Sequence, residues 1–270
     1  MKYLTIVLFL LFSISCKTQV LYNVKGETVI KGKSYKDKLC IIIAGQSNAG
    51  VANSSRDSLP EKLKSPNSLI QIWKDSRGRT ETYSPRPNQI EYSNETAEFD
   101  YSLPFADEWT QDEKKAALVI KVSFGGVKLG SNSLAGGITW FPDQRGELFD
   151  SLVNTFDRAF HHEFNKGFIL RPVVIWAQGE ADATVQGLAD TYAVNLSNLV
   201  NSLEAEVNQN FTSRSIQNPV KLTWIATLLR SNSVSGQNRV DDTQVRNAIS
   251  QFFNGRGDIV IDLDTYPNLS

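Results

Sequence analysis

Short apolar runs that alternate with helical patterns constrain the fold of this chain more than any other feature of its sequence. The first run, residues 39–44, is an unbroken stretch rich in isoleucine and is followed by a glycine. Continuous runs of β-branched residues are typical of strands buried on both faces of a parallel sheet. Five further runs cover residues 69–73, 117–123, 172–177, 222–227 and 258–263.

Apolar residues at helical spacing fill several of the stretches between these runs. Leu148, Leu152 and Phe156 mark one such stretch, and similar patterns cover residues 188–203 and 245–252. Strands that alternate with helices imply βαβ units, in which helices cover both faces of the sheet. We therefore predict one α/β domain, a three-layer αβα sandwich with a mainly parallel central sheet.

The composition excludes several classes of protein. The 270 residues include 28 Lys and Arg against 29 Asp and Glu, and 41% are hydrophobic. Such a chain is too apolar and too weakly charged to be disordered throughout. Nucleic-acid binders normally carry a basic excess, so we expect no nucleic-acid partner. Two cysteines, Cys16 and Cys40, are too few for a disulfide framework or a four-cysteine zinc site.

The N-terminal residues have the pattern of an export signal. An apolar run over residues 3–14 is shorter than the roughly 20 residues of a membrane span, but it suits the core of a signal peptide. Residues 1–16 resemble a bacterial lipoprotein signal in which Cys16 becomes the lipidated N-terminus, and an ordinary secretory signal is the alternative. We expect an exported protein, periplasmic or at the cell surface, that contacts the membrane only through a lipid on Cys16.

The chain after this signal divides into a polar segment and a folded domain. Residues 17–38 are polar and lysine-rich, which predicts a tether or a short leading strand. The domain is expected over residues 39–270. Within it, residues 51–68, 74–103 and 131–146 are rich in Ser, Asn, Pro and charge, which is typical of functional loops.

Polar residues and glycines follow two of the runs at the edge where an open α/β sheet binds its ligands. Ser47 and Asn48 come just after the first run, where a strand turns toward a helix. A serine hydroxyl is exposed there beside backbone N–H groups, which suits a nucleophile, but both residues could equally cap the helix. Gly125 and Gly126 follow the run at 117–123 and allow close approach to a ligand, or they form only a tight turn.

A third segment follows the run at 172–177, where Gln178, Glu180 and Asp182 crowd behind a buried strand. The simpler explanation of Glu180 and Asp182 is that their negative charges interact favourably with the dipole of a helix that begins there. Taken together, Gly-Gln-Ser-Asn, Gly-Gly and Trp-x-Gln-Gly-Glu-x-Asp resemble the SGNH-hydrolase superfamily, and especially its sialate O-acetylesterase and acetylxylan esterase-like carbohydrate esterases. The resemblance extends from about Leu39 to the C-terminus. It implies an SGNH/flavodoxin-like fold and a serine esterase that removes O-acetyl groups from sugars or glycans without a metal or cofactor.

The resemblance implies a role for each matching residue. Ser47 would be the nucleophile that forms an acyl-enzyme. Its own N–H, the N–H of Gly125 or Gly126 and the side-chain amide of Gln178 would form the oxyanion hole. Trp140 could offer a stacking face to a sugar ring, or it could be a core aromatic. Asn48 would be a further supporting residue, and Glu180 and Asp182 would hold the neighbouring loops and Gln178 in place.

The general base is missing from the position where the resemblance places it. In this family it is a histidine in an Asp-x-x-His segment just after the last strand, where the aspartate orients the histidine. Neither Asp262 nor Asp264 is followed three residues later by a histidine. The two histidines of the chain, His161 and His162, fall at the end of a predicted helix, which is not where a base is expected.

Two explanations of the missing base stay open. The sequence lacks a C-terminal segment that begins almost directly after residue 270, or the protein is a degenerate member that binds acylated sugars without efficient turnover. Either way, we expect impaired deacetylation by this chain. A non-catalytic carbohydrate-binding surface lipoprotein on the same scaffold is the alternative function, and the gene sequence beyond codon 270 would separate the two. A flavodoxin-like nucleotide binder also fits the alternation, but the chain has no phosphate loop.

Overall fold

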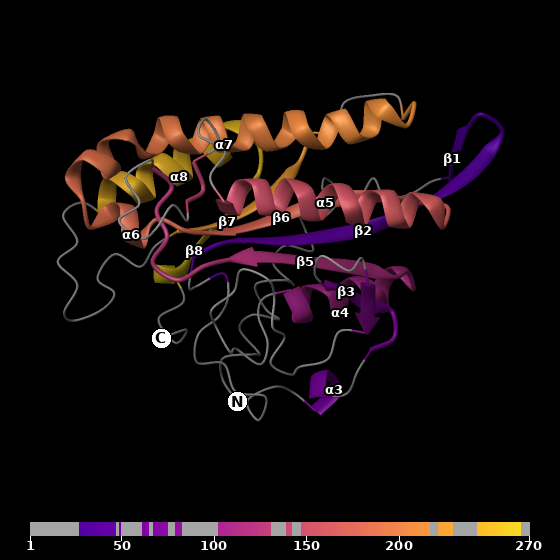
Figure 1. Cartoon of the computed structure of the whole chain (residues 1–270). Coiled ribbons are helices and arrows are strands. Elements are labelled where there is room, and N and C mark those ends of the chain that lie inside the picture. Colours follow the sequence, from indigo (N-terminus) through magenta and orange to yellow (C-terminus); the bar gives the residue numbers. More distant parts are fainter. Residues whose placement is uncertain are drawn as a thin grey trace.

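The protein is built on one eight-stranded sheet with helices on both faces (Figure 1). The computed structural model describes residues 27–46, 49, 61–64, 67–74, 79–82, 102–130, 139–141, 147–216, 221–228 and 242–265. The strand order is β4-β3-β5-β2-β6-β7-β8, and β1 pairs with β2 outside this path. The β1–β2 and β3–β4 pairs are antiparallel, whereas the other pairs are parallel. The strands are β1 (Glu27–Ile30), β2 (Lys33–Gly45), β3 (Ile70–Lys74), β4 (Arg79–Thr82), β5 (Ala117–Ser123), β6 (Phe168–Ala177), β7 (Thr223–Leu228) and β8 (Ile259–Asp262).

The helices form two layers around this sheet. Figure 1 shows α5, α7 and α8 along one face and α3 and α4 on the other, so the predicted three-layer α/β architecture is confirmed. Among the described residues, none of these helices is long and apolar enough to cross a membrane. The helices are α3 (Glu61–Lys64), α4 (Ser102–Glu113), α5 (Glu147–Asn165), α6 (Glu180–Ala183), α7 (Gln186–Ser213) and α8 (Asp242–Arg256), and a 3₁₀ turn, η3 (Leu263–Thr265), follows β8.

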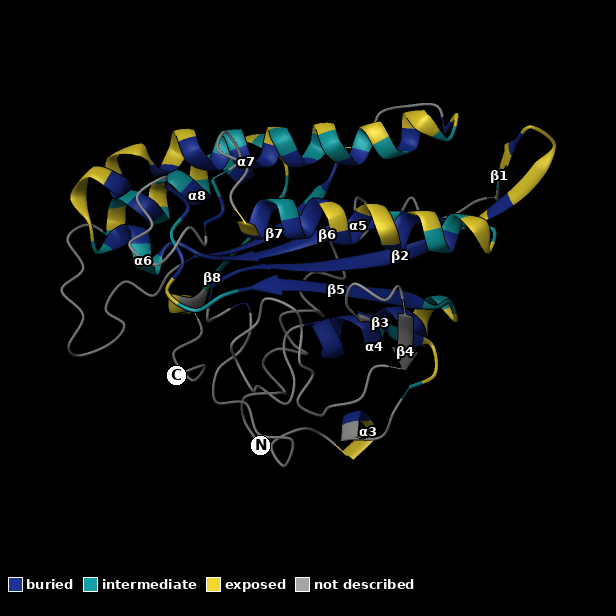
Figure 2. Ribbon diagram, viewed as in Figure 1, coloured by how far each residue is buried: buried dark blue, intermediate teal, exposed yellow. Residues whose placement is uncertain are grey.

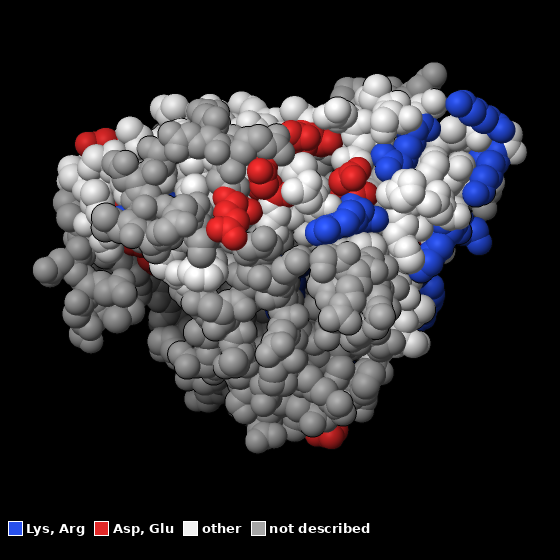
Figure 3. Space-filling view, in the orientation of Figure 1, with Lys and Arg blue, Asp and Glu red and all other residues white. Residues whose placement is uncertain are grey.

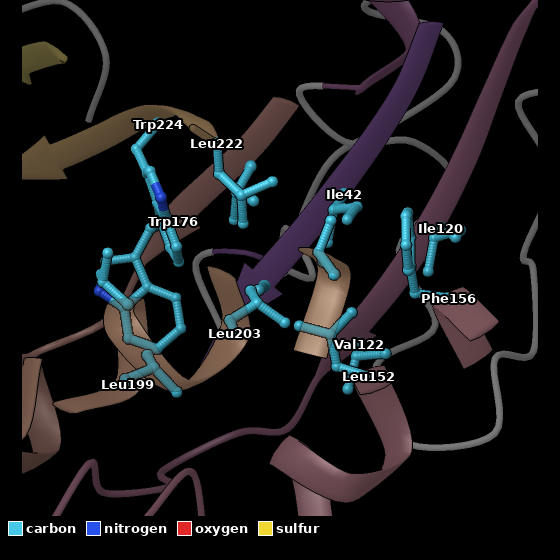
Figure 4. Close-up of a cluster of buried hydrophobic side chains, with 14 of the residues drawn as sticks. Ile42, Ile120, Val122, Leu152, Phe156, Trp176, Leu199, Leu203, Leu222 and Trp224 are labelled. Atoms are coloured by element: carbon cyan, nitrogen blue, oxygen red, sulfur yellow. The ribbon is translucent and has the colours of Figure 1, made fainter. Parts of the chain in front are cut away.

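The two faces of the sheet bury separate cores because successive side chains of a strand point to opposite faces. In β2, Cys40 and Ile42 pack in the larger core beneath α5, α7 and α8, whereas Leu39 and Ile41 pack on the α4 side. Figure 4 shows Ile42 among apolar side chains of the larger core. Figure 2 shows the central strands buried along most of their length, which explains why their sequences read as continuous apolar runs.

The N-terminal boundary of the fold lies earlier than the predicted residue 39. Residues 27–38 were expected to be a polar tether or a short leading strand, and they form β1, a turn and the first half of β2. The two strands make an antiparallel hairpin, in which Glu27 pairs with Lys36 and Ile30 pairs with Lys33. The polar sequence reflects the exposure of this hairpin, which extends beyond the helical layers (Figure 2). A tether is therefore excluded for residues 27–38.

Candidate active site

The carboxyl ends of β2, β5 and β6 meet at one edge of the sheet. Gly45 at the end of β2 is in register with both Ser123 of β5 and Ala177 of β6. The three sequence segments singled out for their polar residues and glycines follow these three strand ends. Strand pairing thus brings together segments that are more than 50 residues apart in the sequence.

A close backbone approach at Gly45 fixes the junction of β2 and β6. Gly45 has a φ of 145°, in the region that favours glycine, and a Cβ atom at this position would lie 2.0 Å from the carbonyl oxygen of Ala177. The next residue, Gln46, donates its backbone N–H to the same carbonyl at 2.9 Å. The carbonyl of Gly45 in turn accepts the indole N–H of Trp140 at 3.0 Å. Only glycine fits this position without separating the strand ends.

The predicted nucleophile segment begins directly after this junction. Ser47 and Asn48 lie outside the described residues, and they are flanked in sequence by Gln46 and Ala49, which are both buried. The N–H of Ala49 donates to the carbonyl of Gln46 at 2.9 Å, and the side-chain oxygen of Gln46 accepts the N–H of Ala181 at 3.4 Å. Gln46, which the sequence analysis did not single out, therefore connects the nucleophile segment to α6.

The glycine segment after β5 lies beside this junction. Gly125 is half-buried and Gly126 is exposed with a φ of 70°, which requires glycine or a strained side chain. The N–H of Phe124 donates to the carbonyl of Gly45 at 3.4 Å, so the start of this segment is held against the end of β2. Lys121 lies within β5, two residues before the end of the strand. Its side chain is buried, and burial lowers the pKa of its ammonium group to about 7.

Gln178, an expected oxyanion donor, is hydrogen-bonded within the protein. Its side chain is buried, and its amide nitrogen donates to the carbonyl of Val127 at 3.2 Å and to the carboxylate of Asp182 at 2.5 Å. Its amide oxygen accepts the hydroxyl of Tyr192 at 2.8 Å. These bonds link the end of β6 to the loop at residues 127–130, and the oxyanion role of Gln178 stays a prediction.

Asp182 is the acceptor at the centre of this network. Its carboxylate is fully buried and accepts the backbone N–H groups of Leu129 and Gly130 at 3.0 to 3.2 Å, besides the amide of Gln178. Burial raises the pKa of Asp182, while these hydrogen bonds oppose the shift. The pKa of Tyr192 is also raised, first by burial and then by the nearby charge of Asp182, so its hydroxyl remains a donor. The expectation that Asp182 holds the neighbouring loops is consistent with this geometry.

The other predicted site residues occupy more varied positions. Glu180 is half-buried and begins α6, directly after Gly179 at the end of β6. Trp140 is fully buried, with its ring 5.3 Å from that of Trp176 in a T-shaped contact. The alternative of an exposed stacking face for a sugar is therefore wrong for Trp140. Its indole instead supports the Gly45 carbonyl from within the larger core.

Both histidines lie far from this edge of the sheet. His161 and His162 are in the last turns of α5, and the ring of His162 contacts Trp73 of β3 at 5.4 Å between centroids. The neighbouring Glu163 binds Lys38, which precedes Gly45 by seven residues and hence by about 23 Å along β2. Burial lowers the pKa of His162, with a further contribution from Lys166. Neither histidine is positioned to accept a proton at the ends of β2, β5 and β6.

The sequence of the chain matches a family of carbohydrate esterases. A family model described as carbohydrate esterase, sialic acid-specific acetylesterase, matches residues 37–246, and the chain belongs to this family. The predicted resemblance is thereby confirmed, and the protein is a member of a family of carbohydrate acetylesterases. A comparison with curated proteins gave no match. Among the described residues, no group of three or more His, Cys, Asp or Glu side chains is placed to hold a metal ion.

Solved structures of low sequence identity share the fold. A protein from Arabidopsis thaliana superposes with a TM-score of 0.60 at 17% identity, over 86% of this chain and 88% of that chain. NanS superposes with a TM-score of 0.56 at 15% identity, over 86% of this chain and 79% of that chain. These similarities extend over most of both chains and support the same α/β architecture.

Proposed function

We propose that this protein is a serine O-acetylesterase scaffold for acetylated sugars, with an O-acetylated sialic acid as the favoured substrate. The family match supports the esterase class and the sugar. The observation that carries the proposal is the meeting of three strand ends. Gly45 lies in close backbone contact with Ala177, and Asp182 accepts the backbone N–H groups of Leu129 and Gly130. In this arrangement the strand end that precedes Ser47 lies beside the strand ends that precede Gly125 and Gln178.

The proposed reaction proceeds through an acyl-enzyme at Ser47. The Ser47 oxygen attacks the acetyl carbonyl carbon while a base takes its proton, and the carbonyl oxygen becomes an oxyanion. The backbone N–H groups of Ser47 and Gly125 would stabilise this charge. The bond to the sugar oxygen then breaks, and that oxygen leaves with a proton. Water attacks the acetyl group on Ser47 and releases acetate, which restores the serine hydroxyl.

Gln178, Asp182 and Tyr192 act in this proposal as positioning residues. Their hydrogen bonds fix the distance between the end of β6 and the loop at residues 127–130. A donor N–H must lie within about 3 Å of the oxyanion, and the loss of a single donor costs on the order of a hundredfold or more in rate. A rigid connection between the two segments therefore matters for catalysis even though these side chains do not touch the substrate.

The expected rate of turnover depends on whether a general base can reach Ser47. His161 and His162 lie beside Glu163, whose partner Lys38 is about 23 Å along β2 from Gly45, so we propose that the 270-residue chain turns over acetyl esters slowly. Loss of the histidine of a serine hydrolase costs several orders of magnitude in rate. The test is hydrolysis of p-nitrophenyl acetate by the wild-type chain and by Ser47→Ala. We expect a low rate from the wild-type chain and a still lower rate from Ser47→Ala, and fast hydrolysis that depends on Ser47 would contradict the impairment.

The distant histidines also favour a second candidate, a surface protein that binds acetylated sugars without turning them over. Calorimetric titration with an O-acetylated sialic acid separates the two candidates when combined with an acetate assay. Binding without any release of acetate that depends on Ser47 supports the binding protein, whereas such release supports the esterase.

A further inference from the structure

The end of the protein opposite the candidate active site carries a cluster of exposed lysines, here named the basic end. Lys36 donates its backbone N–H to the carbonyl of Gly167, so the β1–β2 hairpin and the end of α5 lie side by side. Leu39 pairs with Ala117, which places the start of β5 next to them. The exposed members of the basic end are Lys31, Lys33, Lys36, Lys114 and Lys166.

The acidic residues described at this end are mostly engaged with other cations. Asp37 binds Arg171 at 2.9 Å, and the buried Glu163 binds Lys38 at 2.8 Å and also Lys166 of the basic end at 3.6 Å. Glu113 pairs with the half-exposed Lys115 at 3.6 Å. Among the described side chains, the exposed lysines therefore outnumber the exposed acids, and the end has a net positive charge.

The charge is distributed unevenly along the molecule. Figure 3 shows Lys and Arg side chains gathered at the end with the β1–β2 hairpin, whereas acidic side chains lie toward the other end of α5. The first turn of α5 contains the exposed Glu147 and the half-buried Asp150. The candidate active site lies at the carboxyl ends of β2, β5 and β6, the end of the sheet opposite the basic end.

We propose that the basic end docks on the surface of an anionic lipid bilayer. The proposal is independent of the esterase function, and it rests on the expected lipid anchor at Cys16. Only ten residues, 17–26, separate Cys16 from β1, and they span at most about 36 Å. The chain therefore enters the fold at the same end that carries the lysines. Attraction between lysines and anionic headgroups acts within about 8 Å at physiological salt, which this short connection allows.

Docking in this orientation directs the candidate active site away from the membrane. β2 has 13 residues and runs from Lys33 in the basic end to Gly45 at the site, a distance of about 40 Å. The strand ends would thus face outward, toward glycans at a distance from the bilayer. An anchor alone leaves the orientation free, whereas the lysines select one orientation.

A fluorescence-quenching experiment on the full-length chain in vesicles tests this orientation. Thiol labels are placed at Val29→Cys in β1 or at Val194→Cys in α7, two positions that are 68% and 62% exposed. Cys40 is buried, and the chain without an added cysteine serves as the blank for any label on Cys16. The vesicles contain nitroxide-headgroup lipid as quencher in phosphatidylcholine, with or without phosphatidylglycerol.

We expect strong quenching at position 29 and weak quenching at position 194, and only with phosphatidylglycerol. Replacement of Lys31, Lys33 and Lys36 by Glu should reduce the population of the docked orientation by on the order of tenfold or more, whereas replacement by Arg should preserve it. High salt should reduce the quenching of the wild-type chain as the Glu substitutions do. Because the wild-type chain stays folded in salt, this result excludes misfolding of the Glu variant as the cause of its weaker docking. Equal quenching in both lipid mixtures, equal quenching at both positions, or quenching that survives the Glu substitutions would overturn the proposal.

Discussion

Substitution of Gly45 by alanine should separate the ends of β2 and β6. A Cβ atom at Gly45 would lie 2.0 Å from the carbonyl oxygen of Ala177, whereas real Cβ atoms essentially never come closer than 3.0 Å to a neighbouring heavy atom. The strands must therefore move apart by about 1 Å. The movement weakens the bond from the Gln46 N–H to Ala177, worth about 1 kcal/mol, and the φ of 145° adds about 1–3 kcal/mol of strain for alanine. Together these two contributions predict a loss of about 2–4 kcal/mol in the free energy of unfolding.

The matched control for this substitution is Gly167→Ala. Gly167 also has a positive φ, 92°, but a Cβ atom there would meet nothing within 4 Å. The control thus measures the backbone strain of alanine alone, and the difference between the two variants measures the collision with Ala177. Urea denaturation followed by circular dichroism provides both free energies. If Gly45→Ala is no less stable than Gly167→Ala, the close approach of β2 and β6 does not constrain the site as argued.

Three further substitutions test the surroundings of the site. Asp182→Asn should cost about 2–4 kcal/mol in urea denaturation, because an amide cannot accept all the donors that Asp182 binds, and the exposed Asp190→Asn should change stability by less than about 0.5 kcal/mol. Trp140→Phe should lower the free energy of unfolding by about 1 kcal/mol more than Trp224→Phe. Of the two indoles, only that of Trp140 donates a hydrogen bond within the described residues. Equal losses of stability in the two variants would contradict this. The pKa of Lys121 is lowered to about 7, so the unfolded chain binds more protons between pH 7 and 10.5 and stability should rise with pH over that range, by up to a few kcal/mol. Lys121→Met should remove this rise, and an unchanged pH profile would show that burial does not perturb Lys121.

The strands could be predicted because burial on both faces leaves a simple signature. The run at 117–123 coincides with β5, and the run at 172–177 matches the buried part of β6. The first half of β2 was left open between a tether and a short leading strand, because it belongs to an exposed hairpin in which polar residues alternate with buried ones such as Tyr35. α4 was missed because Pro104 and several charged residues interrupt its apolar pattern, although much of the helix is buried.

The site could be predicted as a set of segments but not as a set of contacts. Strand order determines which loops converge, and the motifs identified the three that do. The direction of an amide is decided by partners that are distant in sequence. For Gln178 these include Val127 and Tyr192, and the local sequence around Gln178 contains no sign of them. For the same reason, Trp140 was left open between a sugar contact and a core position, and only the bond to Gly45 decides it.

We propose above that Ser47, two residues after β2 in the sequence, is the nucleophile of an O-acetylesterase, and that His161 and His162 do not serve as its base. Free imidazole is a base with a pKa near neutrality and can replace a missing histidine side chain in solution. The most direct measurement is therefore acetate release from an O-acetylated sialic acid by the wild-type chain and by Ser47→Ala, over a range of imidazole concentrations. We predict release that rises with imidazole in the wild-type chain and stays at the uncatalysed rate in Ser47→Ala. Equal rates for the two proteins at every imidazole concentration would contradict the assignment of Ser47.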